Sequence, residues 1–176
     1  MDNESAREMD GVQPLLTCVE IASYCRVDWA RVGKDLRFVA QVDRPRGIYL
    51  HWRAGGSLLC PVSVNPTATC ELCVDPKVKK GWYALTLGRC WNTHDTVLAL
   101  LPEVSFHRAE RRLLKESLHG RLLSYSRTTK TSTVSVEVTS GRNIIPVPKI
   151  NPEEFTAIVE HVYSRMLMNQ RKERSE

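Results

Sequence analysis

The sequence predicts a single α+β domain, built on an antiparallel β-meander with an N-terminal, a central basic and a C-terminal helix. Three observations predict this fold class. Short runs of alternating apolar and polar residues are separated by turns rich in Gly, Pro, Asn and Asp. Other segments have the helical period. The sequence lacks the regular alternation of strands and helices that would predict a parallel sheet. We expect the domain to span residues 14–168, between a disordered N-terminus at 1–13 and a charged tail at 169–176.

The N-terminal half is expected to contain one helix followed by three strands. The helix should begin after Pro14 and continue through Val27 and Trp29, with Gly33 as its stop signal. Alternating residues and turns that contain Gly or Pro then predict the strands of the meander at 36–42, 48–53 and 57–64.

The C-terminal half is expected to combine short strands with two helices. An amphipathic basic helix is predicted at 104–123, followed by a mobile Ser/Thr-rich loop at 124–133. Asn151 should cap the last helix, with Pro152 at its first position and Glu154 completing a capping box. Further strands are predicted at 82–87, 97–101, 134–138 and 143–147.

Two close pairs of metal-ligand residues suggest a zinc-stapled loop. Cys70 and Cys73 form a C-x2-C pair, and Cys90 and His94 follow as C-x3-H. Such pairs can supply the four soft ligands of a tetrahedral zinc site, and lysines between them would offset the thiolate charge. Cys60 is a substitute ligand if His94 is not one. With four protein ligands the zinc would be structural; the alternative is that these residues are ordinary thiols and a polar turn.

A cationic stretch is the second candidate site. Between Ser105 and Lys130 there are seven basic and two acidic residues, a surplus equal to the net charge of +5 of the whole chain. A helical ridge of such residues can follow a phosphate backbone without reading its sequence. An anionic membrane surface or an acidic protein patch is an alternative partner, and a solvated face paired with Glu110 and Glu116 is the simplest alternative. The candidate residues are Arg108, Arg111, Arg112 and Lys115 on the ridge, with Arg121, Arg127 and Lys130 continuing it.

Aromatic residues on the meander give a third, weaker signal. Tyr49, His51 and Arg53 share one face of a predicted strand, and Trp52 lies on the other. An exposed aromatic beside an arginine can stack an unpaired base, so Tyr49 and Arg53 are candidate RNA contacts. The alternative is that these side chains complete or cover the core.

No catalytic motif stands out, so we expect a binding protein and not an enzyme. The leading hypothesis is nucleic-acid binding, with RNA favoured, through the cationic helix. A structural or assembly subunit, such as a complex component or a virion matrix-like protein, is the alternative; its basic face would meet acidic protein or lipid, and it could self-associate. A thiol or redox protein with a reactive Cys70, Cys73 or Cys90 is the second alternative.

The location is expected to be intracellular, cytoplasmic or nuclear. The first residues are acidic and polar, which does not fit a secretory signal, and no stretch approaches the ~20 apolar residues of a membrane-spanning helix. The six cysteines are therefore interpreted as belonging to a reducing compartment, where clustered cysteines favour a metal over disulfides.

Overall fold

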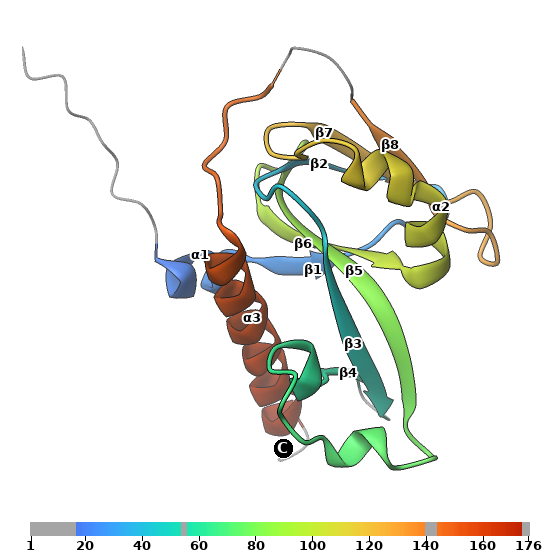
Figure 1. The fold of residues 1–176 in the computed structure, drawn as a ribbon, viewed down its shortest axis with the longest axis vertical. Coiled ribbons are helices and arrows are strands. Elements are labelled where there is room, and N and C mark those ends of the chain that lie inside the picture. Colours follow the sequence, from blue (N-terminus) through green and yellow to red (C-terminus); the bar gives the residue numbers. More distant parts are fainter. Residues whose placement is uncertain (1–16, 54–55, 140–143, 174–176) are drawn as a thin grey trace, which may run out of the picture.

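A mixed eight-stranded sheet with three helices forms one α+β domain (Figure 1). The computed structural model describes residues 17–53, 56–139 and 144–173, so the expected disorder at 1–13 lies outside the described residues. The helices are α1 (Cys18–Tyr24), α2 (Glu103–Leu114) and α3 (Pro152–Glu173), with two short 3-10 turns, η1 (Pro61–Ser63) and η2 (Glu71–Cys73). The strands are β1 (Arg26–Asp28), β2 (Leu36–Ala40), β3 (Arg46–Arg53), β4 (Gly56–Leu59), β5 (Lys79–Cys90), β6 (Thr96–Pro102), β7 (Leu122–Ser126) and β8 (Ser135–Val138).

The 12-residue strand β5 is the centre of the sheet. One edge of β5 pairs with β6 from Tyr83 to Arg89. The other edge is shared, since β3 pairs with its first half and β2 with its last three residues. The sheet then continues from β2 through β7 to β8, while β4 extends the β3 side as a hairpin. The long β3–β5 ladder extends to one end of the domain and runs beside α3, as Figure 1 shows.

Alternation along the central strands divides the interior into two hydrophobic clusters. Leu85, Leu87 and Leu98 face α1 and α3, whereas Ala84 and Leu101 face α2. Arg165 on α3 donates to three backbone carbonyl oxygens at the end of α1, at distances of 2.5 to 2.6 Å. This satisfies carbonyl groups that a helix C-terminus leaves open and ties α1 to α3.

The first expected helix is shorter than predicted. It ends at Tyr24, and Arg26–Asp28 forms β1, which pairs in parallel with β6. Trp29 and Val32 therefore lie outside a helix, and the sheet is mixed instead of purely antiparallel. The reason is tertiary, since pairing with Val97–Ala99 satisfies the backbone of β1, and local helical periodicity does not reveal that partner.

The central helix, the segment that follows it and the segment that precedes α3 also differ from the predictions. Helix α2 ends at Leu114, and residues 122–126, expected as helix and mobile loop, form β7. After the end of α2, Gly120 has a φ of +76°, a left-handed conformation that turns the chain toward β2. Residues 144–150 contain no strand, while position 143 of the expected hairpin lies outside the described residues.

The C-terminal helix has the predicted start. The Glu154 N–H donates to Asn151 Oδ1 at 2.8 Å, and the Asn151 N–H donates to Glu154 Oε2 at 3.0 Å, which is a complete capping box. The helix continues to Glu173, five residues beyond the expected domain end. Within the described chain, no helix combines the length and the apolar character needed to cross a membrane.

Candidate metal centre

Four metal-ligand side chains meet at the far end of the β3–β5 ladder. They are His51, Cys60, Cys70 and Cys73, and one ligand atom of each lies within 4.8 Å of the others. His51 and Cys60 are buried, Cys70 is half-buried and Cys73 is exposed. This cluster could hold a metal ion, and its one imidazole and three thiols are compatible with zinc.

The β3–β4 hairpin supplies two of the four ligands. His51 pairs with Leu58 in the ladder, and the Cys60 N–H donates to the Tyr49 carbonyl oxygen at 2.9 Å. Residues opposite each other in an antiparallel pair point to the same face, so His51 and Cys60 are diagonal neighbours on one face of the hairpin. The strand pairing therefore holds these ligands in place before any metal binds.

The 3-10 turn η2 supplies the other two ligands. Cys70 precedes this turn and Cys73 ends it, and the Cys73 N–H donates to the Cys70 carbonyl oxygen at 3.2 Å. A C-x2-C spacing folded into one turn directs both sulfur atoms to one point, as in structural zinc sites. The expectation that Cys70 and Cys73 act as a pair is consistent with this geometry.

The distances in the cluster fit the edges of a coordination tetrahedron. Bond lengths of ~2.3 Å to sulfur and ~2.0 Å to nitrogen give tetrahedral edges of about 3.8 Å between two sulfur atoms and about 3.5 Å between sulfur and nitrogen. The Cys60 and Cys73 sulfur atoms lie 3.6 Å apart, and His51 Nε2 lies 3.4 Å from Cys70 Sγ and 3.5 Å from Cys73 Sγ. A disulfide would instead need ~2.05 Å between two sulfur atoms.

The protonation states of the cluster also fit metal binding. Burial, together with the charge of Lys80, lowers the pKa of His51, which keeps the imidazole neutral and its lone pair free for a metal. Burial raises the pKa of the Cys60 thiol to about 11. A buried thiol of this kind ionises at neutral pH when a cation is bound to it.

Lys80 supplies a positive charge next to the cluster. Its Nζ lies 3.3 Å from Cys73 Sγ. Desolvation of Cys73 opposes ionisation, but hydrogen bonds from Cys60 and Lys80 outweigh it and lower the pKa of the Cys73 thiol. Three thiolates, one neutral imidazole and a divalent cation carry one net negative charge, which Lys80 offsets.

The segment that carries Cys70 and Cys73 has no core of its own. None of the side chains from Pro61 to Val78 is buried, and the regular structure of this segment is limited to η1 and η2. A segment that buries so little apolar surface gains too little free energy to offset the loss of conformational entropy. A metal that links it to the β3–β4 hairpin would supply the missing stabilisation.

Cys90 and His94 do not belong to this cluster. Cys90 is the last residue of β5, whereas Lys80, beside the cluster, lies near its start. Ten residues of extended strand separate the two points by roughly 34 Å. Cys90 is buried in the interior that α2 covers, and His94 is exposed in the β5–β6 turn with a φ of 61°.

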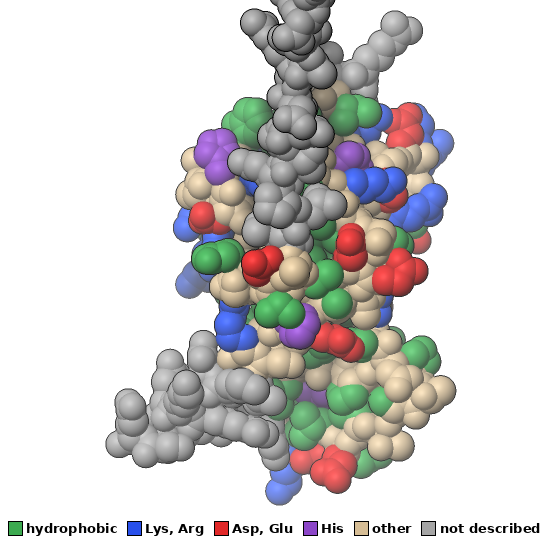
Figure 2. Space-filling model, turned by 90° about the vertical axis from the view of Figure 1, so that its left-hand side faces the viewer, with side chains coloured by type: hydrophobic (Ala, Val, Ile, Leu, Met, Phe, Trp, Pro, Cys, Tyr) green, Lys and Arg blue, Asp and Glu red, His purple; other side chains and the backbone are tan. Residues whose placement is uncertain are grey.

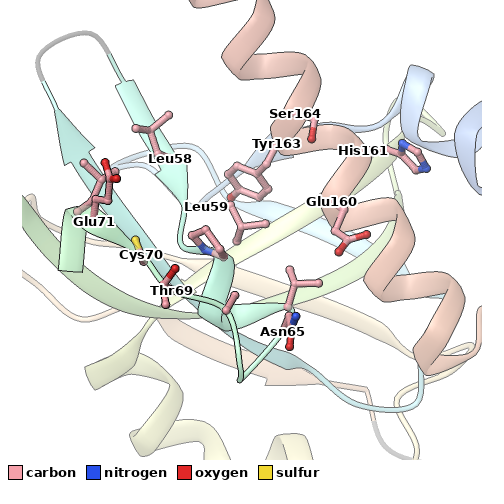
Figure 3. Close-up of a pocket in the computed structure, with 14 residues that line it drawn as sticks. Leu58, Leu59, Asn65, Thr69, Cys70, Glu71, Glu160, His161, Tyr163 and Ser164 are labelled. Atoms are coloured by element: carbon pink, nitrogen blue, oxygen red, sulfur yellow. The ribbon is translucent and has the colours of Figure 1, made fainter. Parts of the chain in front are cut away.

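A pocket of about 700 Å³ lies between the cysteine-bearing segment and α3 (Figure 3). Leu59 and Tyr163 lie at its centre, and Glu71 and Glu160 line it from opposite sides. Cys70 lines this pocket as well as belonging to the cluster. A metal at the cluster would therefore hold one wall of the pocket in place.

The four basic residues expected on the central helix lie where the sequence places them. Arg108, Arg111, Arg112 and Lys115 are exposed on α2 or directly after it, and we call them the cationic face. Arg108 donates to Thr133 Oγ1 at 2.9 Å and Arg112 to the Val136 carbonyl oxygen at 2.8 Å. Within the described chain, none of the four forms an ion pair with a carboxylate.

The three basic residues expected to extend the ridge have separate surroundings. Arg121 pairs with Glu116 at 2.8 Å and donates to the Thr139 carbonyl oxygen. Arg127 is half-buried and lines a pocket near the start of α2, whereas Lys130 is exposed in the β7–β8 loop. Only Lys130 therefore adds a freely exposed cation near the cationic face.

The meander aromatics differ from one another in exposure. Tyr49 is exposed, and the Lys80 Nζ lies 4.3 Å from its ring centroid. His51 is fully buried, which places it in the cluster and removes it as a surface contact. The side chain of Arg53 lies outside the described part of the structure.

The chain matches no known protein family, no curated protein and no solved structure. The functional proposals below therefore depend on the geometry of the chain itself.

Proposed function

We propose that this protein is a zinc-stapled domain that binds RNA through the cationic face on α2. The zinc would be structural and would fix the end of the β3–β5 ladder. The observation that carries the RNA proposal is a group of four neighbouring cations with no carboxylate partner in the described chain. A surface of this kind attracts phosphates through charge and releases their counterions on binding.

Zinc is the metal that this ligand set suits best. Three thiols and an imidazole in a tetrahedral arrangement are soft ligands, which magnesium and calcium do not prefer. All four positions would be filled by side chains, so no position remains for a reacting water. A structural role is therefore favoured over a catalytic one.

The two glutamates close in sequence to the cationic face form no ion pair with its four cations in the described chain. Glu110 lies 3.8 Å from His107 Nδ1, and Glu116 pairs with Arg121. The simplest alternative for this helix, a face neutralised by these two glutamates, is thus disfavoured. By contrast, Figure 2 shows basic and acidic side chains interspersed on the side that carries α1 and α3.

A small hollow at the end of α2 gives the cationic face a place for a phosphate. It has a volume of about 190 Å³, and Arg112, Lys115 and Arg121 line it together with Glu116. Arg112 and Arg121 are already held by hydrogen bonds to carbonyl oxygens of Val136 and Thr139. Side chains fixed in this way lose less conformational entropy when a phosphate binds.

Charge reversal tests the proposal. Arg111→Glu with Lys115→Glu changes two exposed cations that donate no side-chain hydrogen bond within the described chain, and should weaken binding of single-stranded RNA at least about tenfold. The slope of log affinity against log salt concentration should fall by about one for each lost phosphate contact. The matched control is Lys77→Glu with Arg89→Glu, which makes the same charge change outside the cationic face. Equal weakening by the two pairs would contradict the proposal.

A protein or membrane partner would give a different result. If wild-type protein does not bind RNA at low salt but self-associates or captures an acidic protein, the assembly role is correct and the RNA proposal is wrong. The protein could instead bind anionic vesicles and not RNA, and lose vesicle binding when Arg111 and Lys115 are reversed. That result would indicate a membrane surface as the partner.

A further inference from the structure

A second pocket, of about 330 Å³, lies at the rim of the interior beside the start of α2. Its lining includes three aromatic side chains from different parts of the chain, Trp29, Trp52 and Tyr83, together with Pro102 and Arg127. We call it the aromatic pocket. Its volume is at the lower end of the range for small-molecule sites.

The aromatic walls are fixed before any ligand binds. The rings of Trp52 and Tyr83 lie 5.4 Å apart at an angle of 63°, and both pack against the buried cluster under α3. Trp29 is 46% exposed, and the Arg31 guanidinium lies 4.3 Å from the centroid of its ring. Arg31 is itself held by Asp28 at 2.8 Å, so this stacked pair is anchored to β1.

Among the described residues, Arg127 is the one cation that lines the pocket, and one of its N–H groups has no hydrogen-bond partner. Arg127 Nε is buried and donates to no acceptor in the described chain. A buried N–H without an acceptor is unfavourable, and a guanidinium pairs best with a phosphate or a carboxylate. No carboxylate lines the pocket among the residues that the structure describes.

We infer that the aromatic pocket binds a nucleotide, with its base against the aromatic walls and its phosphate near Arg127. Aromatic rings stack on the face of any base, and arginine supplies charge to the phosphate. The nucleotide is either a free nucleoside monophosphate or an unpaired unit of single-stranded RNA. The second form rests on the proposed RNA function; the first does not.

The pocket and the cationic face lie along the same helix, which makes the RNA form geometrically feasible. Pro102 of the pocket precedes α2, and Lys115 of the cationic face follows it. A 12-residue helix is ~18 Å long, so a few nucleotides of an extended strand could reach both ends. A duplex keeps its bases stacked inside and could use only the cationic face.

Titration with adenosine 5′-monophosphate tests the inference, with tryptophan fluorescence and calorimetry as readouts. The monophosphate should quench wild-type fluorescence, and Trp29→Ala or Arg127→Gln should lower its affinity roughly fivefold to a hundredfold. The matched control is Trp91→Ala, which removes another exposed tryptophan, one that does not line the pocket. Equal competition by ribose 5-phosphate, or no effect of Trp29→Ala, would overturn the inference.

RNA of two kinds separates the two sources of the nucleotide. If the pocket takes an unpaired unit of RNA, Trp29→Ala should weaken single-stranded RNA and leave duplex RNA unchanged. If it takes only the free monophosphate, RNA binding should be unaltered. Failure of the proposed cationic face would appear differently, as unaltered binding of both kinds of RNA in Arg111→Glu with Lys115→Glu, whether or not the monophosphate binds.

Discussion

His51 Nε2 lies 3.4 Å from Cys70 Sγ, although the two residues are nineteen positions apart. One comes from a paired strand and the other from a segment without a core. A contact of this kind fixes the irregular segment to the sheet only if something holds the two atoms together. A metal ion would do so, and the distance is close to an edge of a zinc coordination tetrahedron.

Metal removal should loosen one segment and spare the rest of the domain. Chelation should expose residues 61–79 to proteases, with cleavage after Glu71 by a glutamate-specific protease and after Lys77 by trypsin, because no buried side chain holds this segment. Hydrogen exchange should stay slow at Ala84–Leu87 of β5 and Val97–Leu101 of β6, which lie in the buried interior. Equal cleavage of the segment with and without chelator would contradict this.

Replacing Lys80 should weaken metal binding without removing a ligand. Lys80→Met removes the ammonium group 3.3 Å from Cys73 Sγ and leaves one negative charge uncompensated at the site. We expect zinc affinity, measured by competition with a chromophoric chelator, to fall about tenfold, as for other groups that support a metal ligand. Lys79→Met is the control, and an equal loss in both variants would show that only general charge matters.

Shortening a side chain in the interior that α2 covers should strongly lower the free energy of unfolding. Leu113→Ala replaces a fully buried side chain and should lower the free energy of unfolding by ~2–5 kcal/mol. Val104→Ala, on the same helix but 58% exposed, should change it by less than about 0.5 kcal/mol. Urea denaturation of the zinc-loaded proteins measures both. Similar values for the two variants would mean that α2 does not pack on the sheet as described.

The start of α3 offers a test of local structure. Asn151→Ala removes the acceptor for the Glu154 N–H and should destabilise the protein by about 1 kcal/mol. Asn151→Gly should cost only a few tenths, because glycine is tolerated at this position. A smaller loss for alanine than for glycine in thermal denaturation would be inconsistent with the capping box.

Local sequence signals identify the fold class and part of the metal site. The capping box at Asn151, the alternation in β3 and the C-x2-C pair of Cys70 and Cys73 each depend on neighbouring residues, so they are visible in the sequence. The parallel pairing of β1 with β6 depends on a segment about seventy residues away. Such pairing leaves no local periodicity to read.

The remaining ligands of the cluster depend on the register of a hairpin. His51 and Cys60 become neighbours only because Leu50 pairs with Leu59, and a shift of one residue would turn the facing side chains apart. The C-x3-H spacing of Cys90 and His94 resembles that of a zinc site. However, β5 is twice as long as the predicted strand, so Cys90 lies far from the cluster. The sequence identifies Cys60 as a substitute ligand. It does not identify His51, because alternation along the strand places His51 on the same face as Tyr49 and Arg53, which we expect to be exposed.

Metal content of the purified protein and its cysteine variants tests the central claim most directly. Elemental analysis of wild type, Cys70→Ser and Cys90→Ser distinguishes the observed cluster from the spacing-based set. We predict about one zinc per chain in wild type and in Cys90→Ser, and its loss in Cys70→Ser, with increased proteolysis of residues 61–79. No bound metal in wild type, or loss of zinc in Cys90→Ser with retention in Cys70→Ser, would contradict the zinc-stapled site.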